Sequence, residues 1–216
     1  MSAWRRWWGA GAKAAPNAGR WVVVDVETTG LDLRHDHLLA IAAIALRIDG
    51  NATPQVVLAD SFEAVLQHDS RATDKDNILL HGIGVGQQRA GAPPAEVLAA
   101  FEQWLADAPL IAFLAAFDQT MIARAMKAAL GRSLANPWLD LEPVADALHP
   151  DVGGRALDDW LAHFDIDCAV RHQAAADTLA TAELLLRLWP AARAQRCTAF
   201  AELLRLAEQR RWLAQR

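Results

Sequence analysis

The apolar residues in the first third of the chain form short runs separated by polar turns. Residues 21–24 are Trp-Val-Val-Val, and this β-branched run predicts a buried strand. Residues 37–46 predict a second strand, although their alanines also allow a helix. Asp49-Gly50-Asn51 indicates a hairpin turn, after which residues 54–65 predict a third strand.

After a polar, glycine-rich stretch, the pattern changes to alternating helices and short strands. The expected elements are a helix from Pro93-Pro94, a strand at 109–113, a helix at 115–130, a strand or helical turn at 138–148, a short helix at 157–164, and helices at 174–188 and 192–216. Pro190 is expected to stop the first of the last two helices. This order predicts an α/β domain with a mixed sheet of about five strands covered by helices. The short turn between the second and third strands predicts antiparallel neighbours.

Two acidic residues follow the first apolar run directly. Because side chains alternate along a strand, Asp25 and Glu27 point to one face and Val26 points to the other. Two carboxylates side by side at the end of a buried strand repel each other and are costly to desolvate. A divalent cation removes both costs, whereas the alternative is a pair of solvated acids at a strand end. Two acids on one face favour the metal site.

Three further residues are candidates for the same site. Asp118 follows a buried strand and lies early in a helix, while Asp177 lies within a later helix. His172 would point about 140° away from Asp177 if both were helical, so it must occupy the preceding loop to share the site. Taken alone, Asp118 would most often be a helix cap and His172 a surface residue. The prediction therefore depends on the pattern that they form together.

Length, net charge and cysteine content limit the classes of protein to which the chain can belong. At 216 residues the chain suits one domain with a full core. The net charge of −5 gives no overall positive field, but an acidic active site would contribute to it, so a nucleic-acid partner is not excluded. Cys168 and Cys197 have no metal-type or redox-type spacing, which favours a reducing cytoplasm. No apolar stretch is long enough to span a membrane.

Three stretches resemble the motifs of the DEDD exonuclease superfamily. Residues 24–31, Val-Asp-Val-Glu-Thr-Thr-Gly-Leu, are similar to the first motif, residues 110–118 to the second and residues 172–181 to the third. The histidine placed before the last aspartate is typical of the DEDDh branch, to which the proofreading epsilon subunit of DNA polymerase III belongs. His81-Gly82-Ile83 is also similar to a family segment that approaches the bound terminal nucleotide.

This resemblance implies a fold and an activity. The implied fold is ribonuclease H-like, a five-stranded mixed sheet flanked by helices, over residues 20–190. Residues 1–19 would form a mobile basic tail, and residues 191–216 a C-terminal helix packed on the domain or extending from it. The implied activity is metal-dependent 3′–5′ exonucleolytic hydrolysis at the 3′ end of single-stranded DNA, with two Mg²⁺ or Mn²⁺ ions. A DNA polymerase subunit is the implied protein partner.

The resemblance also implies roles for single residues. The implied metal ligands are Asp25, Glu27, Asp118 and Asp177. His172 is the implied general base, a role that suits a side chain titrating near neutrality. The implied contacts to the terminal nucleotide are Thr28, Gly30, Leu31, Asp76 and His81.

Two alternatives remain. The motifs do not separate DNA from short RNA, since both substrates present a single-stranded 3′ end. The family's second motif carries His-Asn where this chain has Phe113-Leu114. That change favours a weakly active or non-catalytic, polymerase-associated subunit that binds nucleic acid, while the intact acids and His172 oppose it.

Overall fold

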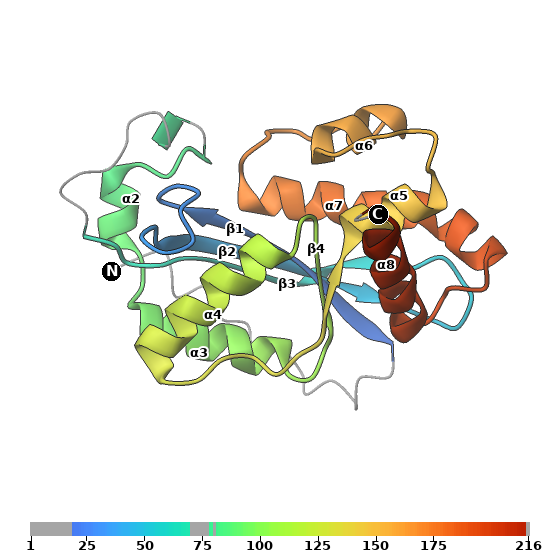
Figure 1. Cartoon of the computed structure of the whole chain (residues 1–216). Coiled ribbons are helices and arrows are strands. Elements are labelled where there is room, and N and C mark those ends of the chain that lie inside the picture. Colours follow the sequence, from blue (N-terminus) through green and yellow to red (C-terminus); the bar gives the residue numbers. More distant parts are fainter. Residues whose placement is uncertain (1–18, 70–77, 80, 215–216) are drawn as a thin grey trace.

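A five-stranded sheet forms the centre of the computed structural model, which describes residues 19–69, 78–79 and 81–214 (Figure 1). The strand order is β3-β2-β1-β4-β5. The strands are β1 Arg20–Thr28, β2 Leu38–Arg47, β3 Gln55–Val65, β4 Leu110–Ala112 and β5 Trp138–Asp140. The first three strands pair antiparallel, while β4 lies parallel to β1 and β5 parallel to β4. The carboxyl ends of β1, β4 and β5 therefore meet at one edge of the sheet.

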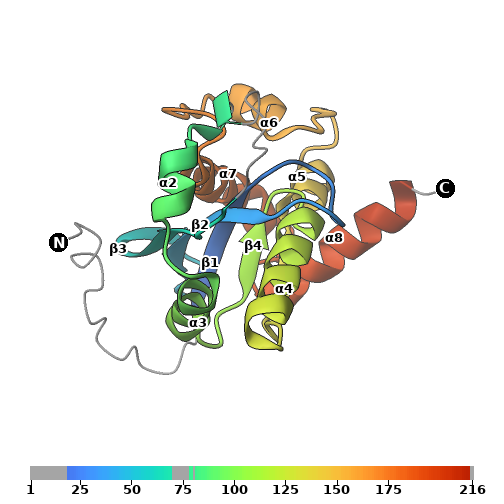
Figure 2. The same cartoon turned by 90° about the vertical axis from the view of Figure 1, so that its left-hand side faces the viewer.

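Helices cover both faces of this sheet. They are α2 Val85–Ala90, α3 Pro94–Leu105, α4 Ala116–Leu130, α5 Leu141–Leu148, α6 Leu157–His163, α7 Ala174–Ala194 and α8 Phe200–Ala214. Figure 2 shows α3 and α4 below the sheet and α5, α6 and α7 above it. Among the described residues, no helix is both long and apolar enough to cross a bilayer.

The alternation of side chains along β1 divides the core into two parts. Val22, Val24 and Val26 pack with α3 and α4. Trp21 and Val23 point to the other face and pack with α5 and α7. Asp25 and Glu27 share the face of Val23 by this alternation, so they lie on the side that α7 covers.

The expectation that Pro190 stops its helix is wrong, because α7 continues to Ala194. Trp189 is fully buried and Ala192 is nearly so. The packing of residues 189–192 offsets the loss of the one main-chain hydrogen bond that a proline cannot donate. The segment expected at 138–148 contains both alternatives, the strand β5 followed directly by the helix α5.

The last helix begins at Phe200 and not at residue 192. The Glu202 carboxylate accepts hydrogen bonds from the main-chain N–H groups of Thr198 at 2.9 Å and Ala199 at 2.8 Å. This side chain therefore satisfies donors that the start of a helix leaves unpaired. Helix α8 packs against α5 and β5.

Candidate active site

Four acidic residues from three different elements influence one another in the fold. Burial raises the pKa of Asp25 well above its usual range. The charges of Asp118, Glu27 and Asp177, in that order, raise it further, and only the Arg171 guanidinium opposes them. The structure thus brings the acids of all three sequence motifs into one electrostatic neighbourhood. It lies where β1 ends, between α4 and the start of α7.

Glu27 stands next to the amino terminus of α7. Burial raises its pKa to about 8, and the Asp177 charge is the next cause. The main-chain N–H of Ala174, the first residue of α7, lowers the pKa of Glu27 and partly offsets these effects. The helix end therefore fixes the side chain without neutralising it.

Asp118 lies in the first turn of α4. The main-chain N–H groups of Asp118 itself and of Val26 lower the pKa of its carboxyl group. Burial nevertheless raises its pKa to about 8, with the charge of Asp140 contributing. Asp140 also accepts a hydrogen bond of 2.9 Å from the main-chain N–H of Leu114 and so shapes the loop that leads to Asp118.

Asp177 lies in the first turn of α7 and is the most heavily hydrogen-bonded of the four acids. Arg171 donates to its Oδ1, and the main-chain N–H of His172 donates to its Oδ2 at 3.0 Å. The same guanidinium also donates to Asp158, so it bridges the cluster and α6. Arg171 is the one cation among the groups that shift the pKa of Asp25.

His172 lies in the turn before α7, as its spacing from Asp177 required. Its side chain is exposed. Its φ is +61°, a conformation that costs free energy for a residue other than glycine. The hydrogen bond from its main-chain N–H to Asp177 holds this turn against the acid cluster.

The residues expected to contact a nucleotide lie in different environments. Thr28 is buried, and its hydroxyl donates to the Gly30 carbonyl at 2.7 Å. A Cβ at Gly30 would lie 2.5 Å from Oδ2 of Asp36, so a larger residue there would have to displace the Asp36 carboxylate. Leu31 is 84% exposed.

His81 is buried, and its Nδ1 accepts a hydrogen bond of 2.9 Å from the Ile83 N–H. Its Nε2 has no hydrogen-bond partner among the described residues. Asp76 lies outside the described residues.

Two residues near the acids were missed by the sequence analysis. Asp140 ends β5 at the same edge as Asp25, and the acid after the apolar Trp138-Leu139 was its only signal. Arg171 directly precedes His172, but nothing in its spacing indicated an ion pair with Asp177.

The donor set of this cluster fits a hard divalent cation. Carboxylate oxygens are the ligands that Mg²⁺ and Mn²⁺ prefer. Burial is the first cause of the raised pKa values of Asp25, Glu27 and Asp118, and the Arg171 guanidinium lowers those of Asp25 and Glu27. Within residues 19–69, 78–79 and 81–214, no three acidic, histidine or cysteine side chains form a complete metal-binding group. Both oxygens of Asp177 accept hydrogen bonds, from Arg171 and from the main-chain N–H of His172.

The fold and the acid cluster define the class of this protein. A mixed five-stranded sheet with helices on both faces and acids at the strand ends is a ribonuclease H-like domain. The family model of the RNase_T exonucleases matches residues 22–185. The chain therefore belongs to this exonuclease family.

Relatives in sequence are polymerase components. DNA polymerase III PolC-type of Bacillus subtilis (strain 168) is 32% identical over 169 residues, which are 78% of this chain and 11% of that protein. A DNA polymerase III subunit epsilon-like protein of Rhodobacter capsulatus is 32% identical over 187 residues, which are 85% of this chain and 25% of that protein. The chain thus spans a small part of each relative.

Solved exonuclease structures share the fold. Escherichia coli Exonuclease I in complex with a dT13 oligonucleotide has a TM-score of 0.67 at 18% identity, covering 82% of this chain and 42% of that one. Exonuclease X in complex with 5′ overhanging duplex DNA has a TM-score of 0.64 at 15% identity, covering 87% and 99%. These likenesses confirm the ribonuclease H-like fold.

Proposed function

We propose that the chain hydrolyses single-stranded DNA from its 3′ end. The observation that carries this proposal is the cluster of four acids at the edge where β1 and its parallel neighbours end, with Asp25 and Glu27 half-buried and Asp118 and Asp177 buried. Such a cluster lowers the stability of the folded chain unless a cation compensates its charge, and carboxyl groups with perturbed pKa values are typical of functional sites. The oligonucleotide bound to the related fold of Exonuclease I supports DNA as the substrate.

Two Mg²⁺ or Mn²⁺ ions would be held by these four carboxylates. When bound, such ions lower the pKa of an attacking water and stabilise the departing 3′ oxygen. The buried position of Asp118 shields its carboxylate from bulk water, while Asp25 is half-buried.

His172 would act as the general base. Its imidazole is exposed on a turn that is hydrogen-bonded to Asp177, so it can accept a proton beside the acid cluster. The exposed Leu31 and the main chain of residues 28–30 would contact the terminal base and sugar, and His81 would lie on the other side of that nucleotide.

One experiment tests the proposal. Purified protein with Mn²⁺ is offered labelled single-stranded DNA, duplex DNA and RNA in parallel, and release of nucleotides from the 3′ end is followed. We expect cleavage of single-stranded DNA, and His172→Ala should lower turnover by roughly 10²–10⁴-fold. Mn²⁺ affinity should be nearly unchanged in this variant, because the four carboxylates remain.

Asp49→Asn is the matched control, since Asp49 is exposed in the hairpin at the other end of the sheet. Unchanged turnover in His172→Ala, or a collapse of its Mn²⁺ affinity, would remove His172 from the mechanism. Faster cleavage of RNA would make the chain an exoribonuclease.

A non-catalytic subunit is the second candidate. The side chain of Leu114 is 51% exposed in the loop between β4 and α4, where the family pattern has a polar residue. Binding of single-stranded DNA without cleavage under Mn²⁺ would establish this function. The polymerase III relatives support a DNA polymerase subunit as the partner in either case.

A further inference from the structure

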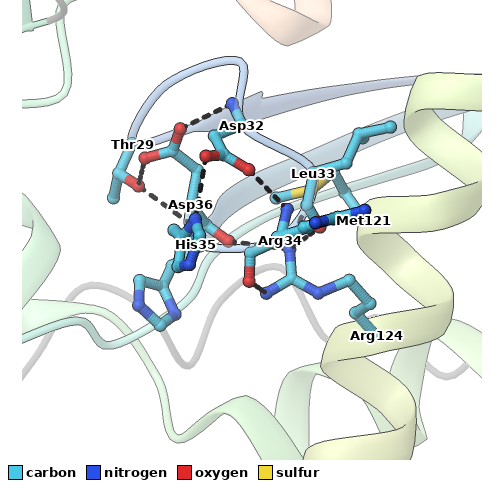
Figure 3. Close-up of polar contacts among 9 residues, drawn as sticks. Thr29, Asp32, Leu33, Arg34, His35, Asp36, Met121 and Arg124 are labelled. Atoms are coloured by element: carbon cyan, nitrogen blue, oxygen red, sulfur yellow. Dashed lines mark hydrogen bonds and ion pairs between the residues drawn. The ribbon is translucent and has the colours of Figure 1, made fainter.

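The loop between β1 and β2 is braced by its own side chains (Figure 3). The Asp36 carboxylate accepts hydrogen bonds of 2.7 Å from both the Thr29 hydroxyl and the Asp32 N–H. The His37 N–H donates to the Thr29 hydroxyl at 2.9 Å, and the Thr29 N–H donates to the His37 carbonyl at 2.9 Å. These contacts close residues 29–37 into a compact unit at the edge of the sheet where Asp25 and Glu27 lie.

Arg124 of α4 holds this loop from outside. One terminal nitrogen of its guanidinium donates to the carbonyl of Leu33 and, at 3.1 Å, to that of Asp36. The other donates to the Arg34 carbonyl at 2.8 Å. Figure 3 shows the Arg124 side chain reaching from the helix to the tip of the loop. In the described part of the chain, no carboxylate pairs with Arg124 at ion-pair distance.

A half-buried arginine directed at three main-chain carbonyls has a specific geometric effect. The turn within the loop directs these carbonyls outward, and main-chain groups of this kind must find a donor when they are shielded from water. A planar guanidinium offers several N–H donors in a rigid fork, so it fixes all three carbonyls relative to α4. The same helix carries Asp118. Arg124 therefore ties the position of the loop to that of one of the acids.

We propose that Arg124 is a positioning residue that holds residues 29–37 in the conformation that receives the terminal nucleotide. This inference rests on the proposed function, because it assigns a purpose to the loop that presents Leu31. The hydrogen bonds of Arg124 go to the loop carbonyls and to Met121, and none goes to the four acids. Arg124 acts through the loop, so its removal should weaken substrate binding much more than it slows hydrolysis.

Three variants test this proposal. Arg124→Ala removes the guanidinium, and Arg124→Lys keeps the charge but lacks the fork, so it should rescue little. Lys127→Ala is the matched control, since Lys127 lies one turn further along α4 and donates to the Gly131 carbonyl. For both Arg124 variants we expect KM for a single-stranded oligonucleotide to rise on the order of tenfold or more, with a much smaller change in kcat. Lys127→Ala should match the parent protein.

Hydrogen exchange supplies a readout that does not depend on nuclease activity. The amides of Asp32, Asp36 and His37 are hydrogen-bonded within the loop and should lose protection in Arg124→Ala, while those of β1 keep theirs. Retained protection of the three amides would overturn the proposal, whether or not the parent protein cleaves DNA. Lost protection with an unchanged KM would also overturn it. An inactive parent protein with lost protection in the variant would instead contradict the proposed function. It would still show that Arg124 holds residues 29–37 in place.

Discussion

Asp25 is a half-buried residue whose carboxyl pKa is raised by desolvation and by three acidic neighbours. Its charge is therefore a cost to the metal-free protein and serves no structural purpose. We predict that Asp25→Asn abolishes nuclease activity and raises the free energy of unfolding by about 1 kcal/mol, the scale of one pKa unit. Urea unfolding in chelator and a nuclease assay in Mn²⁺ would measure both effects. A destabilised variant would show that Asp25 supports the fold.

Arg171 donates to the Asp177 oxygen that a cation would also use. A metal ion must compete with this guanidinium for Asp177. We predict that Arg171→Met lowers the Kd for Mn²⁺ by roughly tenfold, which corresponds to about 1.4 kcal/mol. Calorimetric titration without substrate measures this Kd. Arg132→Met, which breaks an exposed pair with Glu102, is the control. Weaker Mn²⁺ binding in Arg171→Met would mean that Arg171 shapes the site for the metal.

At the scale of elements, α8 is joined to the domain through few buried residues. Only Leu203 and Ala207 of this helix are buried. The helix also forms two ion pairs of 2.6 Å, from Arg210 to Asp146 and from Arg211 to Asp140. We predict that Leu203→Ala lowers the free energy of unfolding by about 2–5 kcal/mol, because it leaves a cavity at this contact. Leu213→Ala should have little effect, since Leu213 is 55% exposed. Equal urea midpoints for the two variants would show that α8 contributes no stability.

For the molecule as a whole, the acid cluster makes stability depend on pH. Glu27 and Asp118 each have a pKa of about 8 in the folded chain, against about 4 in an unfolded one. Between these values the folded chain keeps protons that the unfolded chain has lost. The stabilisation is therefore complete below about pH 4 and is lost as the pH rises through about 8.

We predict that the free energy of unfolding of the metal-free protein falls by at least about 1.4 kcal/mol between about pH 5 and about pH 9. Urea unfolding in chelator across this range is the measurement. The Asp118→Asn variant should show a shallower fall, because it has one fewer group with a raised pKa. A stability that rises with pH over the same range would contradict the uncompensated cluster.

The sequence by itself determined most of the sheet and the local part of the site. The β-branched run before Asp25 sets β1, and alternation along it puts Asp25 and Glu27 on one face. The spacing from His172 to Asp177 required a turn before α7, and the structure has that turn. These inferences hold because they depend on neighbours within a few residues. The four-carboxylate ligand set and the role of His172 stay predictions.

Only the tertiary structure decided the contacts between residues distant in the chain. Arg124 reaches carbonyls about ninety positions away, and Asp140, at the end of β5, raises the pKa of Asp118 on the helix α4. Pro190 has a strong local tendency to end a helix, yet burial of Trp189 and Ala192 outweighs it. The physical reason is common to these cases. Local preferences are worth about one main-chain hydrogen bond, whereas packing and charge act between whatever side chains the fold brings together.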